Sequence, residues 1–504
     1  MGRRAAIVWF RQDLRLHDNE ALTEALEHAQ EVLPVYIFDP RTFGAQTRKF
    51  GFPKTGSHRA KFILESVVEL KKNLRSRGND LLIRIGKPEE ILRDLTLEVR
   101  ASWVFCNRER TEEELKVQDA VEQQLWTIGR EIRYSRGKML YYTSDLPFPV
   151  THTPDVFTNF RKEVEKITPV RDPLPTPVRI PRLIEDNVDY GEPPTLSDFG
   201  ISEPVHDERA AIHFAGGESE GLARLNEYFF DTEAVANYKE TRNGLIGKNY
   251  STKFSAWLAQ GCLSPKRIYH ELKQFEDEVV SNDSTYWVFF ELLWREFFRL
   301  QGKKYDEKIF LKGGPKEAVN PRWHNDRRLL DKWIEGQTGI PFIDANMREI
   351  AATGFMSNRG RQNVASFLVK DLHLNWQMGA EYFESVLTDY DVTSNWCNWN
   401  YVAGIGSDPR EDRYFNILSQ AERYDPKGEY VKLWCPELAT LPAEWIHKPD
   451  QMPPHVQEEY GVKIGGHYPK AIVPTEKWSK NGKRRGGNRD RGRKKGRGNS
   501  RYVA

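Results

Sequence analysis

The first third of the chain alternates short apolar runs with longer segments whose apolar residues recur at helical spacing. Short apolar runs bounded by turns are typical of buried strands. The strand candidates are Ala6–Phe10, Leu33–Phe38, Leu81–Ile85 and Trp103–Cys106. The helix candidates are Glu20–Ala29, His58–Leu74, Pro88–Val99 and Glu112–Thr127. Because helices rather than hairpin turns separate the strands, the pattern predicts an α/β domain with a doubly wound parallel sheet over residues 1–142.

Two local signals accompany these elements. Thr111 and Glu114 match a capping box that opens the helix beginning at Glu112. The segment from Arg11 to Asn19, Arg-Gln-Asp-Leu-Arg-Leu-His-Asp-Asn, follows the first strand, where a dinucleotide-binding fold would carry G-x-G-x-x-G. This segment is typical of a charged loop that ends in a helix cap.

A proline-rich stretch comes next. Eleven prolines lie between Thr143 and Pro204, and proline at this density excludes long helices and central strands. We therefore expect an interdomain linker over residues 143–215, packed on the sheet domain, with one helix near Asp155–Lys166.

Apolar positions at helical spacing dominate residues 216–440 and predict an all-α domain. The helix candidates are Gly221–Phe230, Ser264–Glu278, Thr285–Gln301, Arg327–Glu335, Ile343–Thr353, Arg361–Leu372 and Ala380–Leu387. Residues 441–476 form a C-terminal extension. Residues 477–504 are rich in Lys, Arg, Gly and Asn, and we expect them to be disordered because they have little to bury.

The distribution of charge and the spacing of the cysteines exclude several classes of protein. Between Lys480 and Arg501 there are 11 Lys/Arg and one Asp, which leaves 64 Lys/Arg and 72 Asp/Glu elsewhere, so the basic character belongs to the tail. The four cysteines are far apart and suit neither a disulfide framework nor a zinc site. No apolar run reaches transmembrane length, and the N-terminus lacks a signal-peptide pattern. We expect a cytoplasmic protein without a membrane partner, with the nucleus as the alternative.

Aromatic and polar residues concentrate between Asp389 and Tyr401, where two carboxylates, the Asn395 amide and four large aromatics lie within thirteen residues. Indoles can pass single electrons, and carboxylates and amides can hold a polar heterocycle, so a redox-active ring is one interpretation. An aromatic core segment is the other.

Three further clusters carry candidate chemistry. Ser251–Ser255, with Lys253, precedes a helix and suits an anion site or an ordinary helix cap. Glu291 and Arg295 are four residues apart and can pair on one helix face, as a structural ion pair or on a cavity wall. Asn358, Arg361 and Gln362 share one face, which is either solvated or functional; Arg361 can pair with Asp389 or Asp391.

Several longer motifs resemble the photolyase/cryptochrome flavoproteins. They are Trp9-Phe-Arg-Gln-Asp-Leu-Arg15, Leu293-Trp-Arg-Glu-Phe297, Gln337-Thr-Gly-Ile-Pro-Phe-Ile-Asp344, Ser357-Asn-Arg359 and Asp389-x-Asp391 with Asn395. Gly51–Gly56, Tyr238–Gly244 and Gly406–Phe415 are similar to the cryptochrome-DASH branch. The resemblance covers residues 5–440 in order. It implies an α/β antenna domain, a long linker and a helical domain that binds FAD.

The resemblance also implies roles for individual residues in holding FAD. The diphosphate would contact Tyr238, Ser251, Thr252, Lys253, Phe254 and Ser255, with Arg295 close by. The isoalloxazine or the ribose would contact Asn358, Arg361, Asp389 and Asp391. Asn395 would face the flavin N5, where the redox state is tuned. Trp399, Trp376 and Trp323 match the family's electron-transfer chain from the flavin to the surface, which leaves Trp396 as a packing residue.

The implied activity is that of a deoxyribodipyrimidine photo-lyase, which repairs cyclobutane pyrimidine dimers with light. Glu291, Trp294 and Asn395 are its catalytic candidates. The flipped lesion would contact Glu291, Trp294, Gln362 and Tyr401. Gln362 and Tyr401 stand where double-strand photolyases have Met and Trp. They make the lesion pocket smaller and more polar, so binding of the flipped dimer recovers less of the energy spent on unstacking it. This favours single-stranded or looped DNA, in which flipping costs less.

The resemblance implies 5,10-methenyltetrahydrofolate as an antenna, with Glu109 as its candidate contact. We expect a monomer whose main partner is single-stranded DNA. The Gly/Arg-rich tail favours phosphate-mediated binding of DNA or RNA, although a solubilising or targeting tail explains the same composition. The alternative function is a blue-light photoreceptor with the same flavin and no repair output.

Overall fold

The structure is a computed structural model that describes residues 4–184, 188–319, 322–410 and 413–478. The predicted disordered tail lies outside the described residues, apart from its first two positions. The chain divides into two compact units, residues 1–326 with 349–413 and residues 327–348 with 414–504. The predicted site residues all lie in the first unit. Within the described residues, no helix is both long enough and apolar enough to span a membrane.

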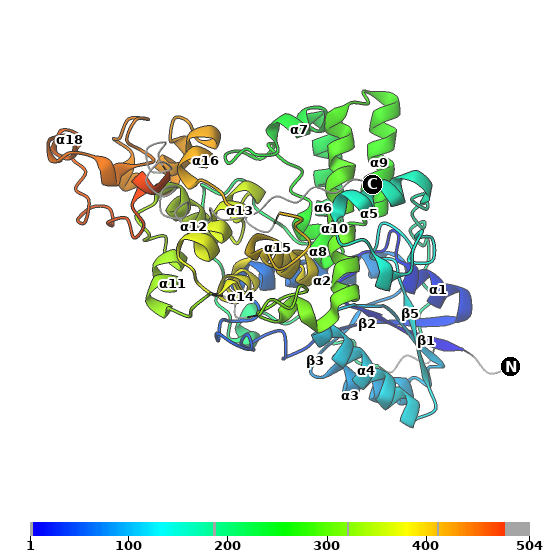
Figure 1. Ribbon diagram of the computed structural model, residues 1–504. Coiled ribbons are helices and arrows are strands. Elements are labelled where there is room, and N and C mark those ends of the chain that lie inside the picture. Colours follow the sequence, from blue (N-terminus) through cyan, green and yellow to red (C-terminus); the bar gives the residue numbers. More distant parts are fainter. Residues whose placement is uncertain (1–3, 185–187, 320–321, 411–412, 479–504) are drawn as a thin grey trace, which may run out of the picture. The chain divides into compact units, whose positions relative to one another are not determined.

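A five-stranded parallel sheet forms the N-terminal part of the first unit (Figure 1). Its strands are β1 (Ala5–Phe10), β2 (Glu31–Phe38), β3 (Leu82–Ile85), β4 (Trp103–Asn107) and β5 (Glu131–Ser135), in the order β3-β2-β1-β4-β5. The predicted doubly wound fold is confirmed. Sequence analysis missed only β5, whose alternating residues include the charged Glu131 and Arg133 and which pairs with β4 alone.

Helices cover both faces of this sheet. They are α1 (Glu20–His28), α2 (Ser57–Ser76), α3 (Pro88–Glu98) and α4 (Glu112–Thr127). Leu92 and Leu95 of α3 and Val121 and Leu125 of α4 share one core with inward residues of the strands, and Figure 1 shows α3 and α4 together beside the sheet. The helix α1 contributes nothing to that core and packs on β1 and β4, so it covers the opposite face.

The charged loop that follows β1 is buried from Asp13 to Asn19. Arg15 donates to three backbone carbonyl oxygens, those of Asp18 and Gly261 at 2.8 Å and that of Gly137 at 2.9 Å. Asp18 forms an ion pair with Lys266 at 2.7 Å. His17 contacts the Glu218 carboxylate. Partners from distant segments offset part of the desolvation cost of these buried charges, and they hold the sheet to the helical part of the first unit. The cap prediction was correct, since the Asn19 side chain accepts from the Leu22 amide.

The predicted capping box at Thr111 does not form. The Thr111 hydroxyl donates to the Glu114 carboxylate at 2.6 Å instead of accepting a backbone N–H. The helix α4 still begins at Glu112 with three acidic residues in its first turn, which the helix dipole favours.

The linker holds α5 (Phe157–Ile167), as expected, and leads into the helical part of the first unit. The helices of this part are α6 (Glu218–Asn226), α7 (Tyr238–Thr241), α8 (Ser255–Gln260), α9 (Pro265–Glu278), α10 (Asp283–Tyr305), α13 (Asn358–Ser366), α14 (Trp376–Val386) and α15 (Val392–Ala403). The helix α15 contains most of the aromatic-rich stretch. It packs against α10 and α14, and Asp391 caps its N-terminus by accepting from the Ser394 amide at 2.8 Å.

The second unit is helical. It contains α11 (Arg327–Ile334), most of α12 (Pro341–Thr353), α16 (Ile417–Tyr424), α17 (Glu429–Trp434) and α18 (Pro454–Glu459). Asp344 is buried at its centre and accepts from the Thr338 amide at 2.8 Å and from the Tyr468 hydroxyl at 2.5 Å. This carboxylate therefore holds α12 to the C-terminal segment.

Candidate functional site

A cavity of about 270 Å³ in the first unit gathers most of the predicted cofactor residues. The predicted residues that line it are Tyr238, Ser251, Thr252, Lys253, Phe254, Ser255, Glu291, Asn358, Arg361, Gln362, Asp389, Asp391, Asn395 and Trp399. They come from α7, the segment before α8, α10, α13 and α15. Segments that are up to 160 residues apart in sequence thus meet in one concave site, which is where small molecules bind.

The two aspartates of the cavity are paired with arginines. Arg361 forms the predicted ion pair with Asp389, with Nη2 at 2.9 Å from Oδ2. Asp391 pairs with Arg299, not with Arg361, at 2.9 Å. Burial would raise the pKa of Asp391, but Arg299 and Arg295 hold it well below its usual range. Both carboxylates are therefore fixed acceptors for N–H or O–H groups of a ligand.

Lys253 also lines this cavity. Its side chain is buried, and within the described residues its ammonium nitrogen has no hydrogen-bond partner. The nitrogen lies 3.0 Å from the Tyr250 ring centroid and 4.8 Å from that of Phe355. Burial lowers the pKa of Lys253 well below its usual value. A buried ammonium is costly unless it is paired, so this end of the cavity fits an anionic group such as a diphosphate.

Asn395 lines the cavity from the first turns of α15. Its amide nitrogen donates to the Ala380 carbonyl oxygen at 3.0 Å, which fixes the orientation of the side chain against α14. An amide carries two donors and an acceptor, so this bond leaves one N–H and the carbonyl oxygen for a ligand.

The expected pair between Glu291 and Arg295 does not form. Glu291 instead pairs with Arg242, whose guanidinium also lies over the Trp287 ring at 4.7 Å. Arg295 donates to the carbonyl oxygens of Lys138 and Leu258 at 3.3 and 3.4 Å and is absent from the cavity lining. Burial raises the pKa of Glu291 against the opposing effect of Arg242.

Arg242 is a site residue that sequence analysis missed. It follows Tyr238 by four residues, and that spacing could have placed it on the same face as Tyr238. Phe355, Met356, Tyr390, Ser394 and Asn398 also line the cavity without having been predicted.

The two predicted lesion-stacking residues, Trp294 and Tyr401, lie next to each other but do not line the cavity. Their rings meet edge to face at 5.9 Å. Trp294 stacks on Phe157 of the linker at 3.8 Å with an interplanar angle of 9°. The Tyr401 hydroxyl accepts from Arg413 at 2.8 Å. Both rings are thus held from outside the cavity.

The tryptophans of α14 and α15 are close packed. Trp399 lines the cavity, and its six-membered ring lies so close to Gly379 that a Cβ there would approach it to 2.2 Å. Trp376, one turn before Gly379, is fully buried and donates from Nε1 to the Lys312 carbonyl oxygen at 3.1 Å. The Lys312 ammonium in turn donates to the Trp323 carbonyl oxygen at 3.2 Å. The structure therefore packs Trp399 of α15 against α14, the helix that carries Trp376, and links Trp376 to the Trp323 segment.

Trp396 has contacts of its own. Its ring meets Trp376 edge to face at 5.7 Å and Phe310 at 5.0 Å, and its Nε1 donates to the Tyr390 hydroxyl at 3.1 Å. It does not line the 270 Å³ cavity, but it is among the residues that line the larger cavity described next.

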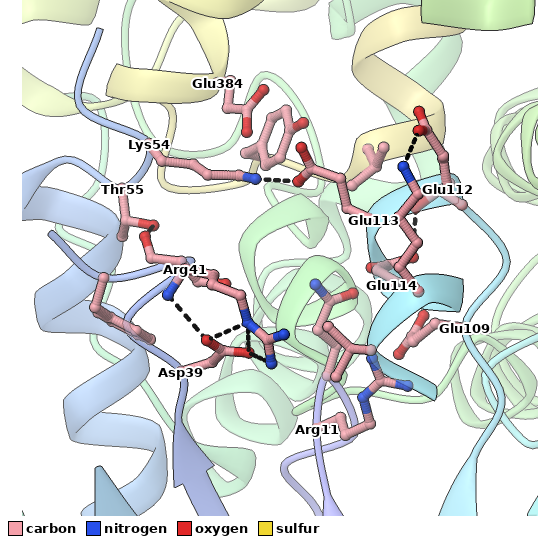
Figure 2. A pocket seen from close by; sticks show the side chains of 18 of the residues that line it. Arg11, Asp39, Arg41, Lys54, Thr55, Glu109, Glu112, Glu113, Glu114 and Glu384 are labelled. Carbon is pink, nitrogen blue, oxygen red and sulfur yellow. Dashed lines mark hydrogen bonds and ion pairs between the residues drawn. The ribbon is translucent and has the colours of Figure 1, made fainter. Parts of the chain in front are cut away.

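A second cavity, of about 670 Å³, lies at the carboxyl edge of the sheet (Figure 2). Arg11, Asp39 and Glu109 follow the ends of β1, β2 and β4, and they line it together with acidic residues of α4 and Glu384 of α14. Open parallel sheets bind ligands at this edge. Glu109 lines the cavity but is buried and ion-paired with Lys138.

Glu384 supplies a test of the electrostatics of this second cavity. Burial raises its pKa from 4.5 to about 7, although Lys54 and Arg59 oppose the shift. A carboxyl whose pKa rises on folding favours the folded state at low pH. As the pH rises from about 4.5 to about 7, this contribution is lost, and the free energy of unfolding falls by up to about 3 kcal/mol. We expect Glu384→Gln to be more stable than the wild type at pH 8 and similar at pH 5 in urea unfolding. Parallel pH dependences of the two proteins would contradict this.

Comparison with known proteins agrees with this geometry. The family model described as DNA photolyase matches residues 6–178, and the FAD binding domain of DNA photolyase matches residues 287–486. The cryptochrome DASH of Gloeobacter violaceus is 50% identical over 473 residues, which cover 94% of each chain. That of Xenopus laevis is 47% identical over 479 residues, covering 95% of this chain and 91% of the relative.

Solved structures agree as well. The crystal structure of a Synechocystis cryptochrome superposes with a TM-score of 0.91 at 45% identity, covering 96% of this chain and all of that one. A class III photolyase from Agrobacterium tumefaciens superposes with a TM-score of 0.81 at 30% identity, covering 95% and 96%. The chain therefore belongs to the photolyase/cryptochrome family, in its cryptochrome-DASH branch, and carries the FAD-binding domain of that family.

Proposed function

We propose that this protein is a DASH-type deoxyribodipyrimidine photo-lyase that repairs cyclobutane pyrimidine dimers in single-stranded or looped DNA. The observation that carries the proposal is the shared cavity: the FAD candidates Lys253 and Asp389 and the lesion candidates Glu291 and Gln362 line the same space. A cofactor and a flipped base bound there would lie within reach of each other. Reduced FAD, when bound and excited by light, supplies the electron that splits the dimer.

The chain's own residues would hold that cofactor by charge and by hydrogen bonds. Lys253 meets the diphosphate with its unpaired ammonium. Asp389 accepts N–H or O–H groups while Arg361 fixes its orientation. Asn395 presents its remaining amide N–H and its carbonyl oxygen to the ring, and its bond to Ala380 prevents rotation.

The lesion would be held by Glu291, which lines the cavity, and by the neighbouring pair Trp294 and Tyr401, which lie outside its lining. Glu291 accepts hydrogen bonds from the pyrimidine edges, and Arg242 keeps its carboxylate in place. Trp294 and Tyr401 offer aromatic faces, which stack on any base. Phe157 behind Trp294 and Arg413 on the Tyr401 hydroxyl hold these two rings.

Single-strand preference can be measured without light. Flipping a dimer out of a duplex costs a few kcal/mol, so we expect dimer-containing single strands to bind roughly ten to several hundred times more tightly than the paired duplex. Fluorescence anisotropy in the dark measures both affinities at one salt concentration, with undamaged strands as the control. Equal affinities for the two damaged substrates would reject this preference.

The larger cavity would hold the antenna. We assign 5,10-methenyltetrahydrofolate to it because the cavity lies at the carboxyl edge of the sheet, where arginine and glutamate side chains can meet a polar heterocycle. Glu109 remains the proposed contact, with Lys138 as its internal partner. Trp399, Trp376 and Trp323 would carry electrons from the surface to the flavin.

The alternative function, a blue-light photoreceptor without repair, uses the same flavin and tryptophans. It is favoured by the name cryptochrome that the relatives carry. The pairing of Glu291 with Arg242 inside the cavity, beside the cofactor candidates, favours repair instead.

A further inference from the structure

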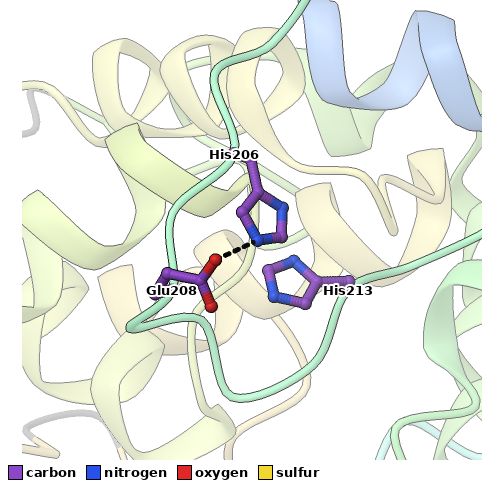
Figure 3. A group of neighbouring side chains, drawn as sticks. All are labelled: His206, Glu208 and His213. Carbon is purple, nitrogen blue, oxygen red and sulfur yellow. Dashed lines mark hydrogen bonds and ion pairs between the residues drawn. The ribbon is translucent and has the colours of Figure 1, made fainter.

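Three potential metal ligands converge in the linker, away from both cavities. His206, Glu208 and His213 each offer one ligand atom, and these atoms lie within 4.8 Å of one another (Figure 3). His206 Nε2 is 2.9 Å from Glu208 Oε1, and the two imidazole rings stack at 4.1 Å. In the part of the chain that the structure describes, this is the one group of three such side chains.

A local turn around Asp207 brings these residues together. The Ala210 amide donates to the Asp207 carbonyl oxygen at 3.1 Å, and the Arg209 amide donates to the Asp207 carboxylate at 2.9 Å. These bonds form a turn that reverses the chain, so His213 returns to the side of His206. The ligand atoms are therefore brought close before any ion binds.

The chemistry of the three groups selects the ion. Two imidazoles and a carboxylate are ligands of zinc and similar transition metals, whereas magnesium and calcium prefer oxygen ligands alone. Ligand atoms around a tetrahedral zinc ion lie about 3.4 Å apart, given metal–ligand bonds of about 2.0–2.1 Å. His206, Glu208 and His213 are all exposed, so small side-chain rotations suffice to reach that spacing.

We propose that His206, Glu208 and His213 form a binding site for one divalent transition-metal ion of the zinc type. Three protein ligands leave one coordination position for water. The ion would close the loop of residues 206–213.

The closed loop would stiffen the segment that follows it. Phe214 packs on Trp257 at 5.4 Å and on Phe355 at 5.3 Å, and Phe355 lines the proposed FAD cavity. The Ala215 carbonyl oxygen accepts from Trp257 Nε1 at 3.0 Å. Metal binding at the loop would thus stabilise one wall of that cavity and raise the apparent unfolding midpoint, because the ion binds the folded chain.

The test uses the full-length protein, purified with FAD but without a histidine tag and freed of metals by a chelator. Zinc chloride is titrated in competition with a coloured zinc indicator. We expect one ion per chain. In metal sites, loss of a residue that only hydrogen-bonds to a ligand costs about 10- to 100-fold in affinity. Loss of a ligand itself should cost at least as much, so His206→Ala and His213→Ala should each weaken zinc binding at least about tenfold.

His152→Ala is the matched control, since His152 is an exposed linker histidine outside the cluster. It should bind zinc like the wild type, and excess magnesium should not displace the ion. The zinc-dependent rise in the unfolding midpoint should disappear in the His206→Ala and His213→Ala proteins, while their metal-free midpoints match the wild type. Absence of zinc binding in the wild type, or unchanged binding in both the His206→Ala and the His213→Ala proteins, would overturn the site.

Discussion

Lys253→Met should lower the affinity for FAD by about 30- to several thousand-fold. The ammonium is buried without a hydrogen-bond partner among the described residues, so the anion that it would meet gains a fully desolvated contact. Removing one member of a buried charge pair costs about 2–5 kcal/mol, which gives this range. Methionine keeps the length and the apolar stem of lysine. Titration of FAD-free protein with FAD, followed by flavin fluorescence, measures the change.

The same substitution should have the opposite effect on the stability of the FAD-free protein. An unpaired buried ammonium destabilises the fold, so its replacement by a thioether leaves the free energy of unfolding unchanged or higher. If Lys253 only stabilised the fold, Lys253→Met would have the reverse effect: the protein would lose stability, and the molecules that remain folded would bind FAD with normal affinity. Lys248→Met is the matched control, because Lys248 is an exposed lysine that pairs with Glu227 at 2.7 Å, and such surface pairs contribute little.

Trp399→Phe should abolish light-driven reduction of the flavin by an external reductant. Trp399 is the one member of the tryptophan chain that lines the cavity, and it meets α14 at Gly379, one turn from Trp376. Phenylalanine keeps an aromatic ring but is a much poorer electron donor than an indole. Absorbance of the oxidised flavin during blue illumination measures the rate.

Trp396→Phe is the control for this prediction. Trp396 lies on the same helix and contacts Trp376, yet it is absent from the cavity lining. Its variant should photoreduce. Chemically reduced Trp399→Phe should still repair dimers, since the relay is needed only to reduce the flavin. Photoreduction in Trp399→Phe at the wild-type rate would remove Trp399 from the path.

The spacing of apolar residues was sufficient to predict the helices and strands that the local sequence determines. The strands β1 to β4 and the helices α1 to α4 have clear periods of two or 3.6 residues or strongly apolar runs, and their ends were predicted to within a few residues. The strand β5 failed because two of its five residues are charged at the edge of the sheet. The aromatic-rich stretch gave no helical signal of its own, because its polar and apolar residues face a cavity on one side and packed helices on the other.

Pairings over long distances could not be predicted in the same way. The charged loop from Arg11 to Asn19 finds its partners Glu218 and Lys266 more than 200 residues away, and local spacing gives no sign of these pairs. Glu291 has Arg295 at helical spacing, but it pairs with Arg242, the residue that directly follows α7. The candidate FAD residues were found by resemblance to a family, whereas their convergence on one cavity required the fold.

The most direct test of dimer repair is illumination of the purified, flavin-loaded protein with a single-stranded oligonucleotide that carries one thymine dimer. Chromatography of the oligonucleotide measures the dimer that remains. We expect the dimer to be converted to two thymines under blue light and to persist in the dark. A coloured protein that photoreduces its flavin but leaves the dimer intact would contradict repair and establish the photoreceptor alternative.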